Sequence, residues 1–128
     1  MKICYIVFLA FFGFVASASA SDEFYSNQYN TCMDKSGGIT ANMQTCIGQE
    51  ASRQDARLNK AYNKLVSELS ASRKKTLLMA QRLWIQFRDS NCGFYGDPDG
   101  GTIAMINQAS CGLKMTSERA RELEGFAE

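Results

Sequence analysis

The 128-residue chain contains no histidine and only one proline, and these absences narrow what the protein can be. Without histidine, no Ser-His-Asp or Cys-His catalytic set and no histidine-ligated metal site can form. The sequence also has no Cys-x-x-Cys pair and no glycine-rich phosphate-binding loop, so it predicts neither a cofactor nor a metal. We therefore expect a protein that is not an enzyme. Hydrolysis by carboxylates alone is the remaining enzymatic alternative.

The N-terminus has the layout of a cleavable secretory signal. Lys2 precedes an apolar run over residues 3–15, and Ala18-Ser19-Ala20 then supplies a small-x-small cleavage pattern. The run is shorter than the roughly 20 apolar residues of a membrane-spanning helix. We expect a signal peptide over residues 1–20, a single domain over residues 21–128, no membrane span after cleavage, and export to the periplasm or the extracellular space.

Charge is unevenly distributed over the expected mature chain. Without Lys2 it has 13 basic and 13 acidic residues, but residues 53–88 carry a net charge of +7. Residues 21–52 and 89–128 carry −3 and −4. Because the basic excess is confined to the middle of the chain, we interpret it as a solvated helix face and expect no nucleic-acid partner.

Two long amphipathic helices are predicted over residues 40–70 and 73–91. Pro98 lies outside both, and positions suited to contacts recur at spacings of four and three. The first stripe comprises Ala51, Asp55, Leu58, Tyr62, Leu65 and Leu69, and the second Leu77, Gln81, Trp84, Arg88 and Asn91. Shorter helices are expected over residues 24–35, 102–109 and 116–124. The expected fold class is all-α, a small helical bundle built on a long antiparallel helical hairpin with two disulfides.

A turn over residues 70–72 would set the register of that hairpin. Asp55 then faces Arg88, and Tyr62 faces Gln81. An ion pair between facing stripes is partly desolvated and fixes register more reliably than it adds stability. Asp55 as a general base would instead need a second catalytic group and a cleft, which the sequence does not offer. The predicted structural core of the hairpin is Asp55, Arg88, Tyr62, Gln81 and Trp84.

The four cysteines beyond the signal are an even number, which in an exported chain indicates two disulfides. The position halfway between Cys32 and Cys46 adjoins Gly37-Gly38. The position halfway between Cys92 and Cys111 adjoins Gly100-Gly101. Residues equidistant from the turn face each other in an antiparallel helical hairpin. The predicted disulfides are therefore Cys32–Cys46 and Cys92–Cys111.

Three blocks of residues carry a resemblance to a known family. They are Cys46, Glu50, Asp55, Leu58-Asn59, Tyr62 and Leu65; then Leu78, Gln81, Trp84, Arg88-Asp89 and Cys92; then Cys111, Thr116, Arg119 and Leu123. Their order and spacing resemble the N-terminal domain of the LprI-type lysozyme-inhibitor family of bacterial exported proteins. The resemblance implies an all-helical exported domain that binds and blocks a lysozyme-like cell-wall hydrolase. The alternative is a non-inhibitory structural or accessory module whose partner is another envelope protein.

A candidate binding loop follows Cys92, over residues 93–101. Its aromatic side chains would serve as anchors, and its carboxylates would steer a cationic lysozyme by electrostatic attraction. The predicted Cys92–Cys111 bridge would hold the ends of this loop and lower the entropy cost of binding. The alternative is that the aromatics cover the core and the aspartates shape a turn. The candidate binding residues are Phe94, Tyr95, Asp97 and Asp99.

Overall fold

The computed structural model describes residues 24–126, so the expected signal peptide lies outside the described residues. Four helices follow one another along the chain: α1 (Asn27–Lys35), α2 (Thr40–Glu68), α3 (Ala71–Tyr95) and α4 (Gly101–Gly125). No strand occurs between residues 24 and 126, and the predicted all-α class is confirmed.

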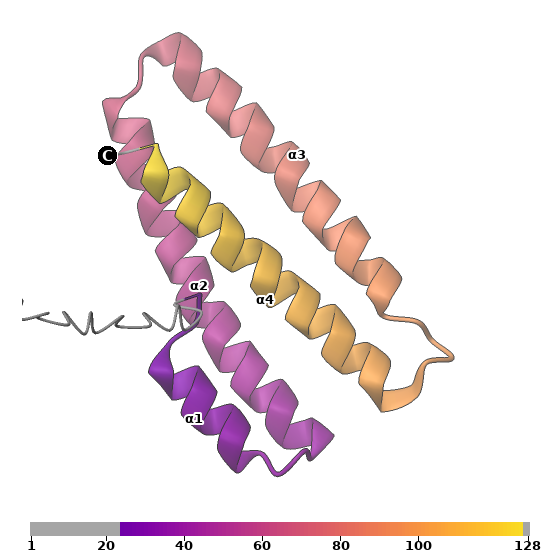
Figure 1. The fold of residues 1–128 in the computed structure, drawn as a ribbon. Coiled ribbons are helices and arrows are strands. Elements are labelled where there is room, and N and C mark those ends of the chain that lie inside the picture. Colours follow the sequence, from indigo (N-terminus) through magenta and orange to yellow (C-terminus); the bar gives the residue numbers. More distant parts are fainter. Residues whose placement is uncertain (1–23, 127–128) are drawn as a thin grey trace, which may run out of the picture.

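Helix α4 lies between α2 and α3 (Figure 1). Contacts join α2 to α4, α3 to α4 and α1 to α2. Helices α2 and α4 run in the same direction, and α3 runs antiparallel to α4 along its other side (Figure 1). The α1–α2 turn at residues 36–39 and the α3–α4 loop at residues 96–100 therefore lie at one end of the bundle, which we call the loop end.

Both predicted disulfides are present, and each closes one of the two connections at the loop end. Cys32–Cys46 joins α1 to α2 with a Cα–Cα distance of 5.6 Å, and Cys92–Cys111 joins α3 to α4 with a Cα–Cα distance of 5.4 Å. The pairing follows the symmetry predicted about the glycine turns. Gly37 and Gly38 adopt positive φ angles of 62° and 73°, which glycine tolerates without a steric cost.

The hydrophobic core consists of two clusters, both built mainly on the contact between α2 and α4. The first comprises Leu58, Ala61, Leu65, Ala120 and Leu123, and the second Ile47, Ile106 and Leu113. Tyr62 and Trp84 pack against the first cluster, as expected. Because the α2 stripe is covered by α4, little of it remains for α3 to contact.

The predicted ion pair between Asp55 and Arg88 is wrong. Asp55 is exposed and accepts a hydrogen bond from Asn59 of its own helix, at 3.2 Å. Arg88 forms its ion pair with the adjacent Asp89, at 2.8 Å. The physical reason is that α4 replaces α3 as the main neighbour of α2, so the two predicted stripes do not face each other.

The prediction of two short helices over residues 102–109 and 116–124 is also wrong. They are parts of α4, a single helix of 25 residues. Gly112 is the weakest helix former between them, and one glycine costs only about 1 kcal/mol. The continuous helix buries a long face, including Leu113, Ser117 and Ala120. That burial outweighs the local propensity.

Trp84 and Gln81 do belong to the inner face of α3, but their partners are on α4. The Arg119 guanidinium lies 5.9 Å from the Trp84 ring centre, and Arg88 lies 5.1 Å from it. Arg119 also donates a hydrogen bond from Nε to Gln81 Oε1 at 3.0 Å. These contacts hold α3 against α4 through polar and cation–π interactions as much as through apolar burial.

Between residues 24 and 126, no helix is both long enough and apolar enough to cross a membrane.

Candidate functional site

The candidate binding residues lie at the loop end, where α3 meets α4. Helix α3 continues to Tyr95, so the connection is shorter than predicted and spans residues 96–100. Phe94 and Tyr95 occupy the last turn of α3, and Asp97 and Asp99 lie in the loop itself. The structure thus brings all four predicted residues to one end of one helical hairpin.

Phe94 and Tyr95 form an aromatic pair that faces solvent. Phe94 is 86 % exposed and Tyr95 is 50 % exposed. Their ring centroids lie 6.2 Å apart with an interplanar angle of 78°, an edge-to-face arrangement. The alternative in which Phe94 covers the core is therefore wrong. Large exposed aromatics on a rigid support are suited to anchor a partner protein.

The two aspartates shape a tight turn and keep free carboxylate oxygens. Asp97 Oδ1 accepts a hydrogen bond from the backbone N–H of Asp99 at 2.9 Å, and its carbonyl accepts one from Gly100 N–H at 3.0 Å. Both side chains are exposed, and neither forms an ion pair with any residue in the described part of the chain. The predicted turn role is correct for Asp97, and it leaves both charges available to solvent.

Glycines allow this loop to close. A Cβ atom at Gly100 would lie 2.8 Å from the Cβ of Ala104, and one at Gly96 would lie 2.5 Å from Gln108 Oε1. Gly101 has a φ of 64°, which a larger residue adopts only at a cost. The loop geometry is therefore set by small residues, and the chain leaves α3 and enters α4 within five residues.

The disulfide lies directly behind this loop. Cys92 is 5 % exposed and precedes Phe94 by half a helical turn. The Asn91 side-chain amide lies 3.6 Å from Cys111 Sγ and 3.5 Å from Met115 Sδ, which adds packing beside the bridge. A covalent link this close to the aromatic pair restricts its motion before any partner binds.

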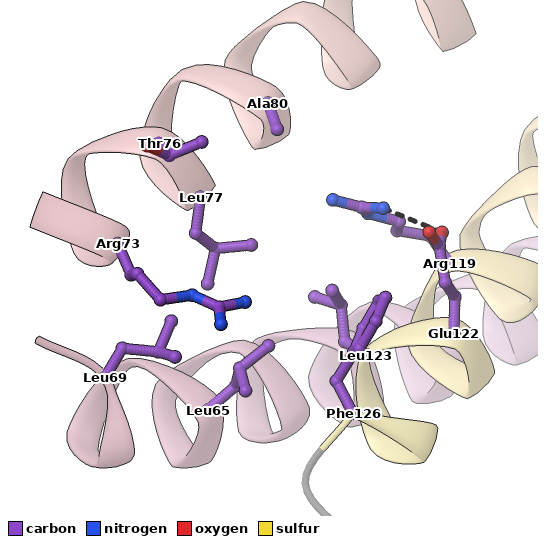
Figure 2. A pocket seen from close by; sticks show the side chains of 10 residues that line it. All are labelled: Leu65, Leu69, Arg73, Thr76, Leu77, Ala80, Arg119, Glu122, Leu123 and Phe126. Carbon is purple, nitrogen blue, oxygen red and sulfur yellow. Dashed lines mark hydrogen bonds and ion pairs between the residues drawn. The ribbon is translucent and has the colours of Figure 1, made fainter.

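A concave feature that was not predicted lies at the opposite end of the bundle. It is a groove of about 410 Å³ between the C-terminal parts of α2 and α4 and the N-terminal part of α3 (Figure 2). Its apolar walls include Leu65, Leu69, Leu77, Ala80, Leu123 and Phe126. Sequence reasoning missed this groove because it paired α2 directly with α3.

The chemistry of the groove does not suit catalysis. Arg73, Arg119 and Glu122 are its charged lining residues. The Glu122 carboxylate is paired with Arg119 at 2.7 Å, and the Arg73 side chain extends between the leucines (Figure 2). A pair of carboxylates for general acid–base hydrolysis is missing from this lining. Among residues 24–126, no cluster of three or more acidic, histidine or cysteine side chains could hold a metal ion.

The fold and the loop end together define a small, disulfide-braced, all-helical domain that presents an exposed aromatic pair beside an acidic loop. The family model described as "Lysozyme inhibitor LprI" matches residues 32–123 of the chain, from the first described cysteine to the last turn of α4. The chain belongs to this family, and the resemblance found in the sequence is confirmed.

A relative is found among curated proteins. The protein named "Uncharacterized protein R02472", from Rhizobium meliloti (strain 1021), is 29 % identical over 100 residues. The alignment covers 67 % of this chain and 72 % of that protein. No solved structure matches the chain.

Proposed function

We propose that the mature protein binds and blocks a lysozyme-like cell-wall hydrolase, and that the loop end is the binding surface. The proposal is supported by membership of the LprI family, whose description is that of a lysozyme inhibitor. One observation points to the surface: the exposed Phe94–Tyr95 pair stands beside two unpaired carboxylates on a loop that a disulfide braces.

The two carboxylates suit the loop end to a cationic target. Asp97 and Asp99 offer negative charge next to the aromatic anchors, which speeds the approach of a basic protein. The cations of residues 73–75 would repel such a target, but they lie in the first turns of α3. At 1.5 Å per residue they are about 30 Å from Tyr95 along the helix. Repulsion at that distance is screened at physiological ionic strength.

The proposal also includes where the protein acts and how it acts. We infer that residues 1–20 are removed as a signal peptide and that residues 21–128 act in the periplasm or outside the cell. The protein acts by binding, without catalysis of its own. The structural or accessory alternative predicts that the same surface has no effect on any lysozyme.

The test is a turbidity assay of peptidoglycan-bearing cells, treated with lysozyme and increasing amounts of the mature chain. Protection is expected, and Phe94→Ala with Tyr95→Ala should weaken it at least about tenfold. Asp97→Asn with Asp99→Asn keeps the turn acceptor but removes both charges, so it should slow association and reduce its dependence on salt.

Phe126→Ala is the matched control, because Phe126 is a 65 % exposed aromatic at the opposite end of the bundle. It should inhibit as the unchanged protein does. A complete lack of protection, with an excess of protein over a panel of lysozymes, would refute the inhibitor function. Protection that survives the Phe94 and Tyr95 substitutions would keep the function and move the surface elsewhere.

A further inference from the structure

Most of the surface of helix α3 faces solvent. All 25 of its residues lie in the described part of the chain, and Cys92 is the one that is buried. Three exposed apolar side chains follow one another at helical spacing: Met79 is 66 %, Leu83 is 59 % and Phe87 is 60 % exposed. Positions four residues apart lie on one side of a helix, so these three form a continuous row. We call it the α3 row.

Basic side chains accompany the α3 row. Lys75 and Arg82 lie two turns apart beside the row on the outward side of α3, whereas Lys74 lies 18 residues before the buried Cys92 and therefore on the inner side of the helix. All three are exposed, and none forms an ion pair or side-chain hydrogen bond with any residue between 24 and 126. Asp89 is the single acidic residue of α3, and Arg88 neutralises it.

These features limit what can cover the α3 row. A second copy of the chain would bring the same unpaired cations against one another, and like charges in an interface are costly. A cationic protein such as a basic lysozyme is disfavoured for the same reason. An anionic surface that also accepts apolar side chains is compatible with both the exposed cations and the apolar row. A basic amphipathic helix binds an anionic bilayer in this way, with its apolar side chains in the headgroup boundary.

We propose that the outward face of α3 is a binding surface for an anionic phospholipid bilayer. Met79, Leu83 and Phe87 enter the boundary between headgroups and acyl chains, and Lys75 and Arg82 contact lipid phosphates. The bilayer is bound from one side and is not crossed. The proposal is independent of lysozyme binding, because the α3 row and the four loop-end residues are different side chains.

The test is co-sedimentation of residues 21–128 with vesicles of phosphatidylcholine alone or mixed with phosphatidylglycerol. The protein should sediment with the anionic vesicles at physiological salt and be released at high salt. Leu83→Gln with Phe87→Gln should weaken vesicle binding at least about tenfold, because two inserted side chains are lost. Each cation removed by Lys75→Gln or Arg82→Gln should weaken it about fivefold.

Ile103→Gln with Met105→Gln is the matched control, since both are exposed apolar residues on α4. It should sediment as the unchanged protein does. All substituted positions are exposed, and far-ultraviolet circular dichroism checks that each variant is folded. The proposal is overturned if anionic vesicles bind no protein, or if binding ignores both the lipid charge and the α3 substitutions. It is equally overturned if the chain is a dimer that Leu83→Gln with Phe87→Gln dissociates, since the row would then bind a second copy.

Discussion

The carboxylate of Glu50 accepts hydrogen bonds from both the backbone N–H and the hydroxyl of Ser26, at 2.9 and 2.6 Å. Ser26 is the N-cap of α1, and its hydroxyl also accepts from the N–H of Tyr29. Glu50 is fully buried in the middle of α2 and is further bonded by Arg53 and Gln54. One side chain therefore fixes the start of α1 to α2, at the far end of that pair from the Cys32–Cys46 bridge.

This arrangement predicts a dependence of stability on pH. Burial alone would raise the pKa of Glu50, but the hydrogen bonds from Ser26, Gln54 and Arg53 outweigh it and hold the pKa below its usual value of 4.5. A carboxyl with a lower pKa in the folded state stabilises the fold when ionised, above its unfolded pKa. That stabilisation is lost as the pH falls through the folded pKa.

Urea unfolding at several pH values measures the effect. Glu50→Gln should lower the free energy of unfolding by about 1–3 kcal/mol near pH 6, because buried donors lose a charged acceptor. The variant should also lose less stability than the unchanged protein between about pH 6 and about pH 3. Glu118→Gln, at an exposed carboxylate on α4, is the control and should behave as the unchanged protein. Parallel pH curves for Glu50→Gln and the unchanged protein would contradict this role.

A second prediction concerns the two residues that the sequence paired wrongly. Arg88→Ala should cost about 1–2 kcal/mol of stability, because it removes the stacking on Trp84 and the hydrogen bond to Thr116 Oγ1 at 3.3 Å. Asp55→Ala should change the stability by no more than about 0.5 kcal/mol, since the side chain is exposed. Thermal unfolding of both single variants and the double variant measures the coupling. A coupling energy above about 1 kcal/mol would favour the antiparallel α2–α3 pairing instead.

Removal of either disulfide should lower stability by a similar amount, but the two removals should differ in their effect on inhibition. On the chain-entropy model a closed loop of about 15 residues is worth about 3 kcal/mol, and the longer loop slightly more. Cys32→Ala with Cys46→Ala and Cys92→Ala with Cys111→Ala should therefore both lower the free energy of unfolding by a similar amount. Inhibition should fall more for the second pair, because that bridge lies beside the aromatic pair and joins the two ends of the acidic loop. The comparison is made at a temperature where both variants remain folded, and equal losses of inhibition would argue against the loop as the binding surface.

Processing gives a fourth prediction. Mass spectrometry of the exported protein should find Ser21 at the N-terminus and no free thiol, because Ala18-Ser19-Ala20 precedes the expected cut and four cysteines follow it. Recovery from the cell envelope of a chain that still begins at Met1 would contradict the signal-peptide interpretation.

The sequence predicted the disulfides well and the helix packing poorly, for a physical reason. The connection between Cys92 and Cys111 is short, so local turn geometry determines which residues meet. The register of α2 against α3 depends instead on what a third helix does, and stripes at Leu58 or Trp84 do not say which partner they contact. Since α4 buries the larger face, it takes the position beside α2 that the hairpin argument assigned to α3.

The candidate site could be found from the sequence because Phe94, Tyr95, Asp97 and Asp99 are close together in the chain. Whether these side chains are exposed could not be predicted, since aromatics that cover the core and aspartates that shape a turn would give the same sequence. The α3 row had a visible signal in the spacing of Met79, Leu83 and Phe87. The spacing alone could not identify a binding surface, because helical periodicity reports which residues share a side and not whether that side is covered.

The placement of both disulfides at the loop end has a consequence for local opening. The one disulfide on α3 is at Cys92, and the short backbone connection at residues 69–70, which joins α2 to the start of α3, has no disulfide nearby. Backbone amides of α3 should therefore exchange with deuterium progressively faster from Cys92 back toward Ala71, without global unfolding. The amides of α2 and α4 around Leu58 and Ala120 should exchange last. In this protein, the helix with the most exposed large apolar side chains is also one that a disulfide braces at one end only.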